Sequence, residues 1–235
     1  MGLPRGLPFL PGGDFINASG GAEMTTKWQA FLQQIVLLIS KGYFFYHKTE
    51  YPVTKMHKWE IIDEKLIKKY DANRDRFRVY RRKKKGEASF KVLRWYDQCV
   101  ILHNEGVRPA TDDPDKFIDI MITPLNIRVS SLLSFNVSLV KGHVQVILAE
   151  DTYDSIRDNL GMMCRDKLID NRTVVETFAR LNGIPPYKGV NLQKYRLKEF
   201  VFKEFRRHQR KISKSDLRIR TKRKLYRFYE KAPAT

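Results

Sequence analysis

The sequence predicts an α+β fold, in which N-terminal helices and a basic helical C-terminal module flank a central antiparallel sheet. Short apolar runs bounded by turn residues fill the middle of the chain, whereas apolar residues recur at helical spacing at both ends. With 235 residues and 42% hydrophobic content, the chain is long enough to bury a sizeable core. We divide it into a flexible leader (1–23), an α+β domain (24–150) and a basic helical module (151–235).

The charge of the chain points to a polyanionic partner. It carries 45 Lys or Arg against 26 acids, which gives a net charge of +19 and a pI near 9.9. Attraction to phosphate is the usual reason for such an excess, and counterion release then makes binding salt-dependent. The longest apolar run, Ile35 to Ile39, is too short to span a bilayer, and no lipid-anchor motif accompanies the charge. We therefore expect a nucleic-acid partner and no membrane partner.

The two cysteines, Cys99 and Cys164, both lie within apolar patterns. Buried, reduced thiols are expected from this placement, as is usual in cytoplasmic proteins. Two cysteines also do not suffice for a zinc knuckle. The cysteine content therefore favours a cytoplasmic location.

Two helices and a short strand are predicted near the N-terminus. The first helix starts near Thr25 and ends before Gly42, because its apolar residues fall on one face. A short aromatic strand follows at Tyr43–Tyr46. Thr54 is a candidate cap for a second helix that runs to Lys69.

A first basic stretch, from Arg74 to Arg94, is predicted to form a β-ribbon. In its first strand Phe77 and Val79 alternate with cations. Lys85–Glu87 would form the turn, and Ser89–Trp95 would be the second, returning strand. Such a ribbon can hold a nucleic-acid backbone or enter a groove, and the alternative is an edge strand protected by lysines. The candidate contacts here are Arg74, Arg76, Arg78, Arg81, Arg82, Lys83, Lys84, Lys85 and Arg94.

The middle of the chain is predicted to supply most of the sheet. Strands are expected at Gln98–His103, Phe117–Ile122 and Ile127–Val129, with an acidic loop at 107–116. The clearest hairpin joins 134–140 to 143–149 through Lys141 and Gly142. A helix then starts at Asp151.

The second basic stretch, from Lys194 to Lys231, holds sixteen Lys or Arg against four acids. We expect two ordered helices in it. In the first, Leu197, Val201 and Phe205 recur at helical spacing, with cations on the other sides. The second would be capped within Ser213–Asp216 and would carry Leu217, Leu225, Phe228 and Tyr229.

The entry to this stretch resembles a helix-turn-helix, although its turn is longer than the compact three- or four-residue form. A short helix, Val174–Leu181, precedes a turn and then a basic helix from about Val190, with Ala179 and Gly183 four residues apart. The alternative is an ordinary helical hairpin with a proline-stiffened loop. The candidate contacts of the module are Lys188, Asn191, Gln193, Lys194, Arg196, Lys198, Arg206, Arg207, Arg210, Arg218, Arg220, Lys222, Arg223 and Lys224.

Catalytic motifs are sparse. The sequence lacks a Walker loop, G-x-G-x-x-G and H-E-x-x-H, so we predict no cofactor and no bound metal. His103 and His143 would form a metal site with Glu105 or Asp119 only if their strands were neighbours. The tyrosines set among cations, Tyr187 and Tyr195, are candidate nucleophiles, although such residues more often pack or stack.

The sequence therefore predicts a nucleic-acid-binding protein in which two cationic surfaces clamp a phosphate backbone. Interspersed aromatics would stack or pack: Phe77, Tyr80, Trp95, Tyr187, Tyr195 and Tyr226. The ribbon and the helix-turn-helix favour DNA over RNA, and replication or mobilisation of a plasmid, phage or transposon is one setting. Two alternatives stay open, namely a DNA nickase or recombinase with a metal or tyrosine site, and a structural RNA-binding component of a ribonucleoprotein.

Overall fold

The computed structural model describes residues 23–109, 115–213, 215–222 and 224–226, and the fold is α+β as predicted. The proposed leader before residue 23, the acids Asp112 and Asp113, and Phe228 and Tyr229 lie outside the described residues. The elements in chain order are β1 (Glu23–Met24), α1 (Trp28–Ser40), β2 (Phe45–Glu50), the 3-10 helix η1 (Val53–Lys58), α2 (Trp59–Tyr70), α3 (Arg76–Lys84), β3 (Phe90–Trp95), β4 (Gln98–His103), β5 (Ile118–Asp119), β6 (Leu125–Ser130), β7 (Leu133–Val140), β8 (His143–Leu148), α4 (Glu150–Arg165), α5 (Asn171–Arg180), the 3-10 helix η2 (Leu181–Gly183) and α6 (Lys188–Arg207).

A five-stranded sheet forms one half of the molecule, in the order β1-β3-β4-β2-β5. Only β1 runs parallel to its neighbour; β2, β3, β4 and β5 pair antiparallel. Every residue of β4 is buried, because α1 covers one face of the sheet through Val100 and Leu102 and α2 covers the other through Cys99 and Ile101. This double cover explains why the strand is a continuous apolar run.

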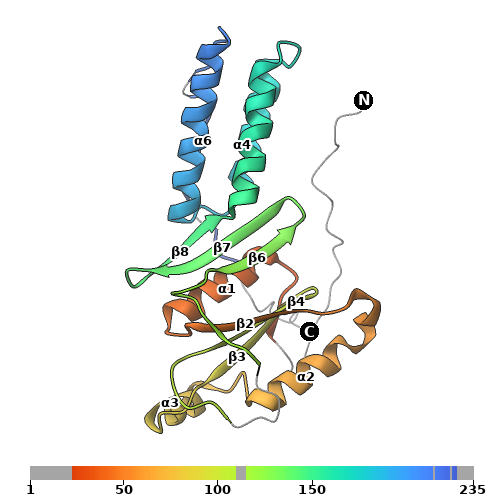
Figure 1. Ribbon diagram of the computed structural model, residues 1–235, viewed down its shortest axis with the longest axis vertical. Coiled ribbons are helices and arrows are strands. Elements are labelled where there is room, and N and C mark those ends of the chain that lie inside the picture. Colours follow the sequence, from red (N-terminus) through yellow and green to blue (C-terminus); the bar gives the residue numbers. More distant parts are fainter. Residues whose placement is uncertain (1–22, 110–114, 214, 223, 227–235) are drawn as a thin grey trace, which may run out of the picture.

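A second, three-stranded sheet lies on the far side of α1 (Figure 1). Its β7–β8 hairpin confirms the prediction: Val140 pairs with His143, and the turn residues Lys141 and Gly142 both have positive φ, 50° and 77°. The Trp28 ring of α1 stacks on Phe135 of β7 at a centroid distance of 5.5 Å. Helix α1 is thus buried between the two sheets.

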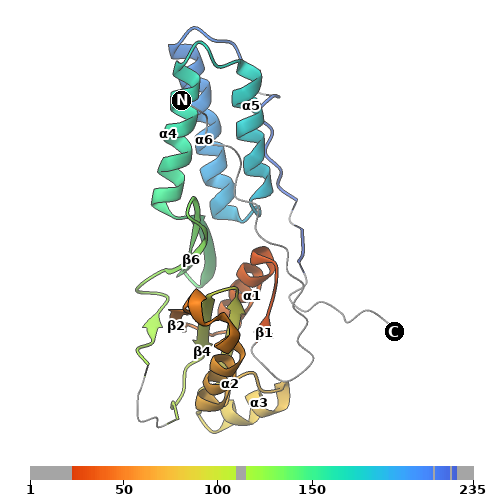
Figure 2. The ribbon, with the colours of Figure 1, turned by 90° about the vertical axis from the view of Figure 1, so that its right-hand side faces the viewer.

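The helices α4, α5 and α6 form a bundle beyond the second sheet (Figures 1 and 2). The predicted apolar face of α6 is confirmed, since Leu197, Val201 and Phe205 are buried. The described residues of 211–226 (211–213, 215–222 and 224–226), which we call the C-terminal strap, run back alongside α5 toward α1 (Figure 2). The apolar core continues from α1 through the second sheet into this bundle without a break.

Most predicted elements shift by a few residues in the structure, and three differ in ways that affect the pairing or the start of an element. The second helix begins as a 3-10 turn, and its α-helical part starts at Trp59 and not at Thr54. Strand β2 extends to Glu50 because it pairs with β4 along its whole length. The strand predicted at 117–122 is reduced to β5, which pairs only with Phe45 and Tyr46.

The predicted basic β-ribbon is wrong in its first half. Residues 76–84 form helix α3, because the Asp75 carboxylate caps it by accepting hydrogen bonds from the backbone N–H groups of Phe77 and Arg78, at 2.8 and 3.0 Å. The cations at 81–85 then occupy the C-terminal turn, where they complement the helix dipole. The returning strand, β3, is confirmed.

The second basic helix predicted after Ile212 is also absent from the described part of the strap. The Asp216 N–H donates to the Ser213 carbonyl oxygen at 3.1 Å, and Ser215 and Asp216 are in a turn conformation. Beyond it, Leu217 is buried, Ile219 is half-buried, and Arg218 and Arg220 are exposed. This alternation is that of an extended chain and not of a helix.

Helix α6 starts against the edge of β8. Gln193 accepts a hydrogen bond from the Leu148 N–H at 2.7 Å and donates to the Leu148 carbonyl oxygen at 3.1 Å. One turn earlier, a Cβ on Gly189 would lie 2.5 Å from the Val146 carbonyl oxygen. Only a glycine therefore allows this close approach of helix and strand.

We expect Gly189→Ala to lower the free energy of unfolding by about 1–3 kcal/mol, because the methyl group would overlap the backbone of β8. Denaturant unfolding would measure the loss. Gly183→Ala is the matched control, since a Cβ there meets nothing within 4 Å, and it should change stability by less than about 0.5 kcal/mol. Equal stability of the two variants would contradict the packing described here.

Candidate nucleic-acid interface

Helix α3 carries the first cationic surface, which we call the α3 surface (residues 74–85). It holds eight Lys or Arg and one acid, Asp75. The structure describes α3 completely, and only Val79 and Arg82 in it are even half-buried. The exposed cations of this surface are Arg74, Arg76, Arg78, Arg81, Lys83, Lys84 and Lys85.

Local ion pairs hold α3 to the rest of the fold. Arg82 turns inward and lies 2.9 Å from Asp71 and 3.8 Å from Glu87. Hydrogen bonds from the backbone N–H groups of Arg78 and Phe77 lower the pKa of Asp75, so the capping group is ionised. Arg82 thus attaches α3 to the neighbouring loops, and the acids beside the helix stabilise its position.

The strap carries the second cationic surface, formed by Arg218, Arg220, Lys222 and Lys224, all exposed. Two side chains from other elements hold its backbone. Asn182 donates to the Arg218 carbonyl oxygen at 3.0 Å and accepts from the Arg220 N–H at 2.8 Å. Gln33 of α1 donates to the Lys224 carbonyl oxygen at 2.9 Å and accepts from the Tyr226 N–H at 3.1 Å.

Arg210 was predicted to contact nucleic acid, but the structure uses it inside the fold. Its Nη1 lies 3.0 Å from the carbonyl oxygens of Met163, Cys164 and Asp166, and its Nε donates to Asn171 at 2.8 Å. These carbonyls belong to the end of α4, where backbone oxygens have no partner within the helix. Arg210 therefore caps α4 and fixes the start of the strap.

Three residues predicted to form a recognition helix are also engaged within the fold. Asn191 donates to the Pro186 carbonyl oxygen at 3.4 Å, and Gln193 bonds the edge of β8. Lys194 is only 1% exposed, and its ammonium donates to the Ile184 carbonyl oxygen at 2.8 Å. One side of the first turns of α6 thus faces protein, and these three of the five predicted recognition residues are used within the fold. The helix-turn-helix stays a prediction that now depends on Arg196 and Lys198.

Arg94 is likewise a structural residue. Its Nε donates to the Asp63 carboxylate at 2.7 Å, and both side chains are buried between β3 and α2. Tyr51 donates to the other oxygen of Asp63 at 2.9 Å. Burial raises the pKa of Asp63, and the ion pair with Arg94 opposes that rise. We leave Arg94 out of the candidate interface.

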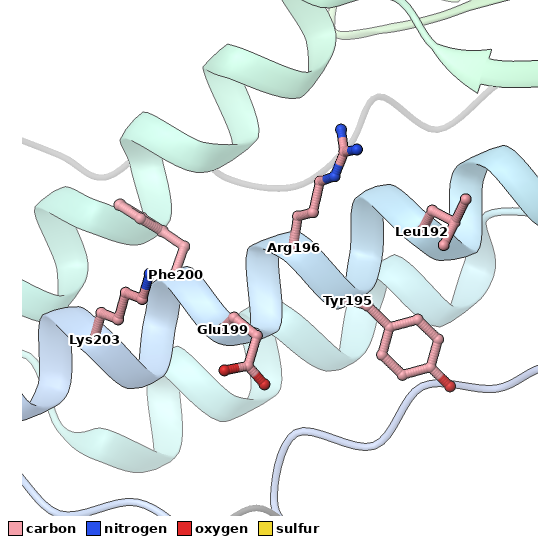
Figure 3. Close-up of a pocket in the computed structure, with 6 residues that line it drawn as sticks. All are labelled: Leu192, Tyr195, Arg196, Glu199, Phe200 and Lys203. Atoms are coloured by element: carbon pink, nitrogen blue, oxygen red, sulfur yellow. The ribbon is translucent and has the colours of Figure 1, made fainter.

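The remaining candidates lie on the outside of α6. Lys188, Arg196, Arg206 and Arg207 are exposed, and Lys198 is half-buried. A hollow of about 450 Å³ lies on this helix. Figure 3 shows its lining residues, with Phe200 directed toward α4. Its lining residues are Leu192, Tyr195, Arg196, Glu199, Phe200 and Lys203. Arg223 lies outside the described residues.

Of the six aromatic residues predicted to stack or pack, some are buried in the fold and others are exposed. Trp95 and Tyr187 are buried, and Tyr226 is half-buried beneath the ammonium of Lys224, which lies 5.4 Å from its ring centroid. Phe77 and Tyr80 on α3 are 74% and 58% exposed, and Tyr195 on α6 is about half exposed. Of the predicted stacking residues, these three rings are open to a ligand.

The α3 surface and the strap lie apart. Helix α3 lies at one end of the long axis (Figures 1 and 2). The strap cations lie nearer the middle of the molecule, because Asn182 of η2 and Gln33 of α1 hold their backbone. A clamp formed by two cationic surfaces on one phosphate backbone stays a prediction.

The two histidines considered for a metal site lie apart. His103 and His143 lie on β4 and β8, which belong to different sheets. His103 packs instead among Phe45, Phe90 and Phe117, and burial lowers its pKa. Among the described residues, no three His, Cys, Asp or Glu side chains come together as a metal site. Both cysteines are buried and unpaired, as predicted.

Comparisons with known proteins supply no relative: no family model, curated protein or solved structure matches the chain. Within the described ranges, none of the helices has the length and apolar character needed to cross a bilayer. The candidate interface therefore rests on the residues and contacts described above.

The buried Lys194 should make stability depend on pH. Burial lowers its pKa from 10.5 to about 8, so between these values the unfolded chain binds a proton that the folded chain has released. Stability should accordingly rise as the pH increases from about 8 to 10.5. Denaturant unfolding across this range should show a smaller rise in Lys194→Met than in the wild type.

Lys203→Met provides the control, because it removes an exposed lysine from the same helix. Its pH dependence should follow the wild type. Identical slopes in all three proteins would contradict the burial of the Lys194 ammonium.

Proposed function

We propose that the protein binds nucleic acid through its phosphate backbone, with the strap as the principal contact and the α3 surface as a second. The observation that carries the proposal is the row of exposed cations on a strap whose backbone other elements hold in place. A solvated basic tail would need no such attachment. A pre-ordered row of cations meets a polyanion with little further loss of conformational entropy.

The spacing of these cations supports the proposal. In an extended chain, alternate side chains point to the same side and repeat about every 6.6 Å. Leu217 and Ile219 pack against the core, while Arg218 and Arg220 are exposed. Lys222 and Lys224 are also exposed. The described part of the strap thus offers four cations within a short, held segment to a phosphate backbone.

The preference for DNA loses its structural support. It depended on a basic ribbon and a recognition helix; residues 76–84 are helical, and the start of α6 packs on β8. Contacts made through phosphates position a ligand but do not read its sequence. We therefore propose that the protein binds the phosphate backbone of nucleic acid without preference for a base sequence. A role in replication or mobilisation stays a hypothesis.

Replacing Arg218, Arg220, Lys222 and Lys224 together by Gln should weaken binding across all sequences. Each lost phosphate contact should flatten the slope of log K against log salt, by about 0.9 on duplex DNA and about 0.7 on single strands. Titrations between about 50 and 200 mM salt would therefore show a combined change of about 3 in that slope.

The matched control replaces four exposed lysines outside both surfaces, Lys41, Lys55, Lys58 and Lys141, by Gln. It removes the same charge from elsewhere on the molecule. If both variants lowered affinity and slope alike, only the net charge would matter, and the strap would not be a binding surface.

We also expect two binding sites per chain for oligonucleotides of about 12 nucleotides, because the two surfaces are separate: α3 lies at one end of the molecule, and the strap is held by η2 and α1. Calorimetric titration should give a stoichiometry of two. The strap variant should retain one site, and so should a variant with Arg76, Arg81, Lys83, Lys84 and Lys85 replaced by Gln. Loss of all binding in either variant would restore the single clamp.

A further inference from the structure

Helix α3 holds two aromatic rings in solvent among its cations. Phe77 is 74% exposed and Tyr80 is 58% exposed, although large apolar side chains are usually found in the interior. They stand three residues apart and therefore share one face of the helix. Val79 points elsewhere and is half-buried.

Packing does not account for the position of these rings. No residue of α3, all of which the structure describes, is fully buried, so the helix gains little from an apolar face. It is ordered instead by the Asp75 cap and by the ion pairs of Arg82 with Asp71 and Glu87. These contacts fix the inner side of the helix and leave the rings on the outer side.

The surroundings of the rings are strongly cationic. Arg76, Arg81, Lys83 and Lys84 are exposed within one helical turn of Phe77 or Tyr80. The Lys84 ammonium lies 5.0 Å from the centroid of the Tyr80 ring. Flat apolar faces and positive charges therefore lie side by side, as they do where proteins bind unpaired nucleobases and the phosphates between them.

We propose that Phe77 and Tyr80 stack on unpaired bases, so that the α3 surface selects single-stranded segments of the nucleic acid. This inference rests on the proposed function, since the surrounding cations must first hold the backbone. In a duplex the base faces are already stacked on their neighbours and are closed to a side chain. The α3 surface would thus add a strand-state preference that the strap lacks.

An anionic membrane is the competing partner for a basic helix with aromatics. Helices that lie in a bilayer surface bury a broad apolar face. In α3 the exposed apolar residues are Phe77 and Tyr80 alone, and cations flank both. So small an apolar area favours ring stacking over insertion into lipid.

The test compares three ligands of about 12 nucleotides: an oligo(dT) strand, an abasic strand of the same length, and a duplex. The first two carry the same phosphates and differ only in their bases. The test is made in the strap variant (Arg218, Arg220, Lys222 and Lys224 replaced by Gln), in which only the α3 surface is left to bind, and the substitutions below are made in the same background. This protein should bind oligo(dT) about tenfold or more tightly than the abasic strand or the duplex, which corresponds to stacking on one or two bases. Fluorescence anisotropy at one fixed salt concentration would measure all three affinities.

Two double variants separate ring stacking from apolar contact. Phe77→Leu with Tyr80→Leu keeps apolar side chains and helix propensity but removes the rings, and should bind oligo(dT) and the abasic strand alike. Phe77→Trp with Tyr80→Trp should keep the preference for oligo(dT). Circular dichroism of both variants would show that α3 remains folded.

The outcomes distinguish the two proposals. If neither strand binds the wild-type protein, the proposed function itself fails. If the strap variant binds both strands equally, backbone binding stands and the stacking proposal is overturned. Two results together would assign α3 to a membrane surface instead. Oligo(dT) and the abasic strand would bind equally, and both the unsubstituted protein and the Leu variant would sediment with phosphatidylserine vesicles.

Discussion

The order of the C-terminal half depends on the guanidinium group of Arg210. This group donates hydrogen bonds to carbonyl oxygens at the end of α4 and in the loop that follows, and to the Asn171 side chain at the start of α5. It also lies over the Phe205 ring of α6, 4.9 Å from the ring centroid. The end of α4 would otherwise leave carbonyl groups unpaired. Because the strap begins at the next residue, the same contact sets the direction in which its cations run.

The basic residues of this protein therefore have two different uses. Arg82, Arg94, Lys194 and Arg210 are held by carboxylates or carbonyl oxygens, and they stabilise the packing of helices and strands. The cations of α3 and of the strap lie in solvent on backbones that such contacts fix. Buried cations need partners because desolvation is unfavourable, whereas exposed cations retain their hydration until a polyanion replaces it.

Much of the fold was predictable from local pattern. The apolar face of α1, the continuous strand β4 and the Lys141–Gly142 hairpin each follow from periodicity or turn chemistry within a few residues. Residues 76–84 were assigned wrongly because Phe77 and Val79 imitate a strand alternation. The signal that decides for a helix was present in Asp75, whose carboxylate caps it, followed by Arg and Lys, which are good helix formers.

The sequence by itself determined the fold class, the excess of positive charge and the two stretches that carry most of it, because composition and short-range periodicity encode these directly. Only the tertiary structure decided which cations face solvent. Lys194 and Lys198 are both lysines one turn apart on α6, yet the first is buried against the Ile184 carbonyl oxygen and the second is only half-buried. The two lysines differ in burial because different segments pack against different sides of α6. The positions of those segments depend on contacts between residues that are distant in the chain.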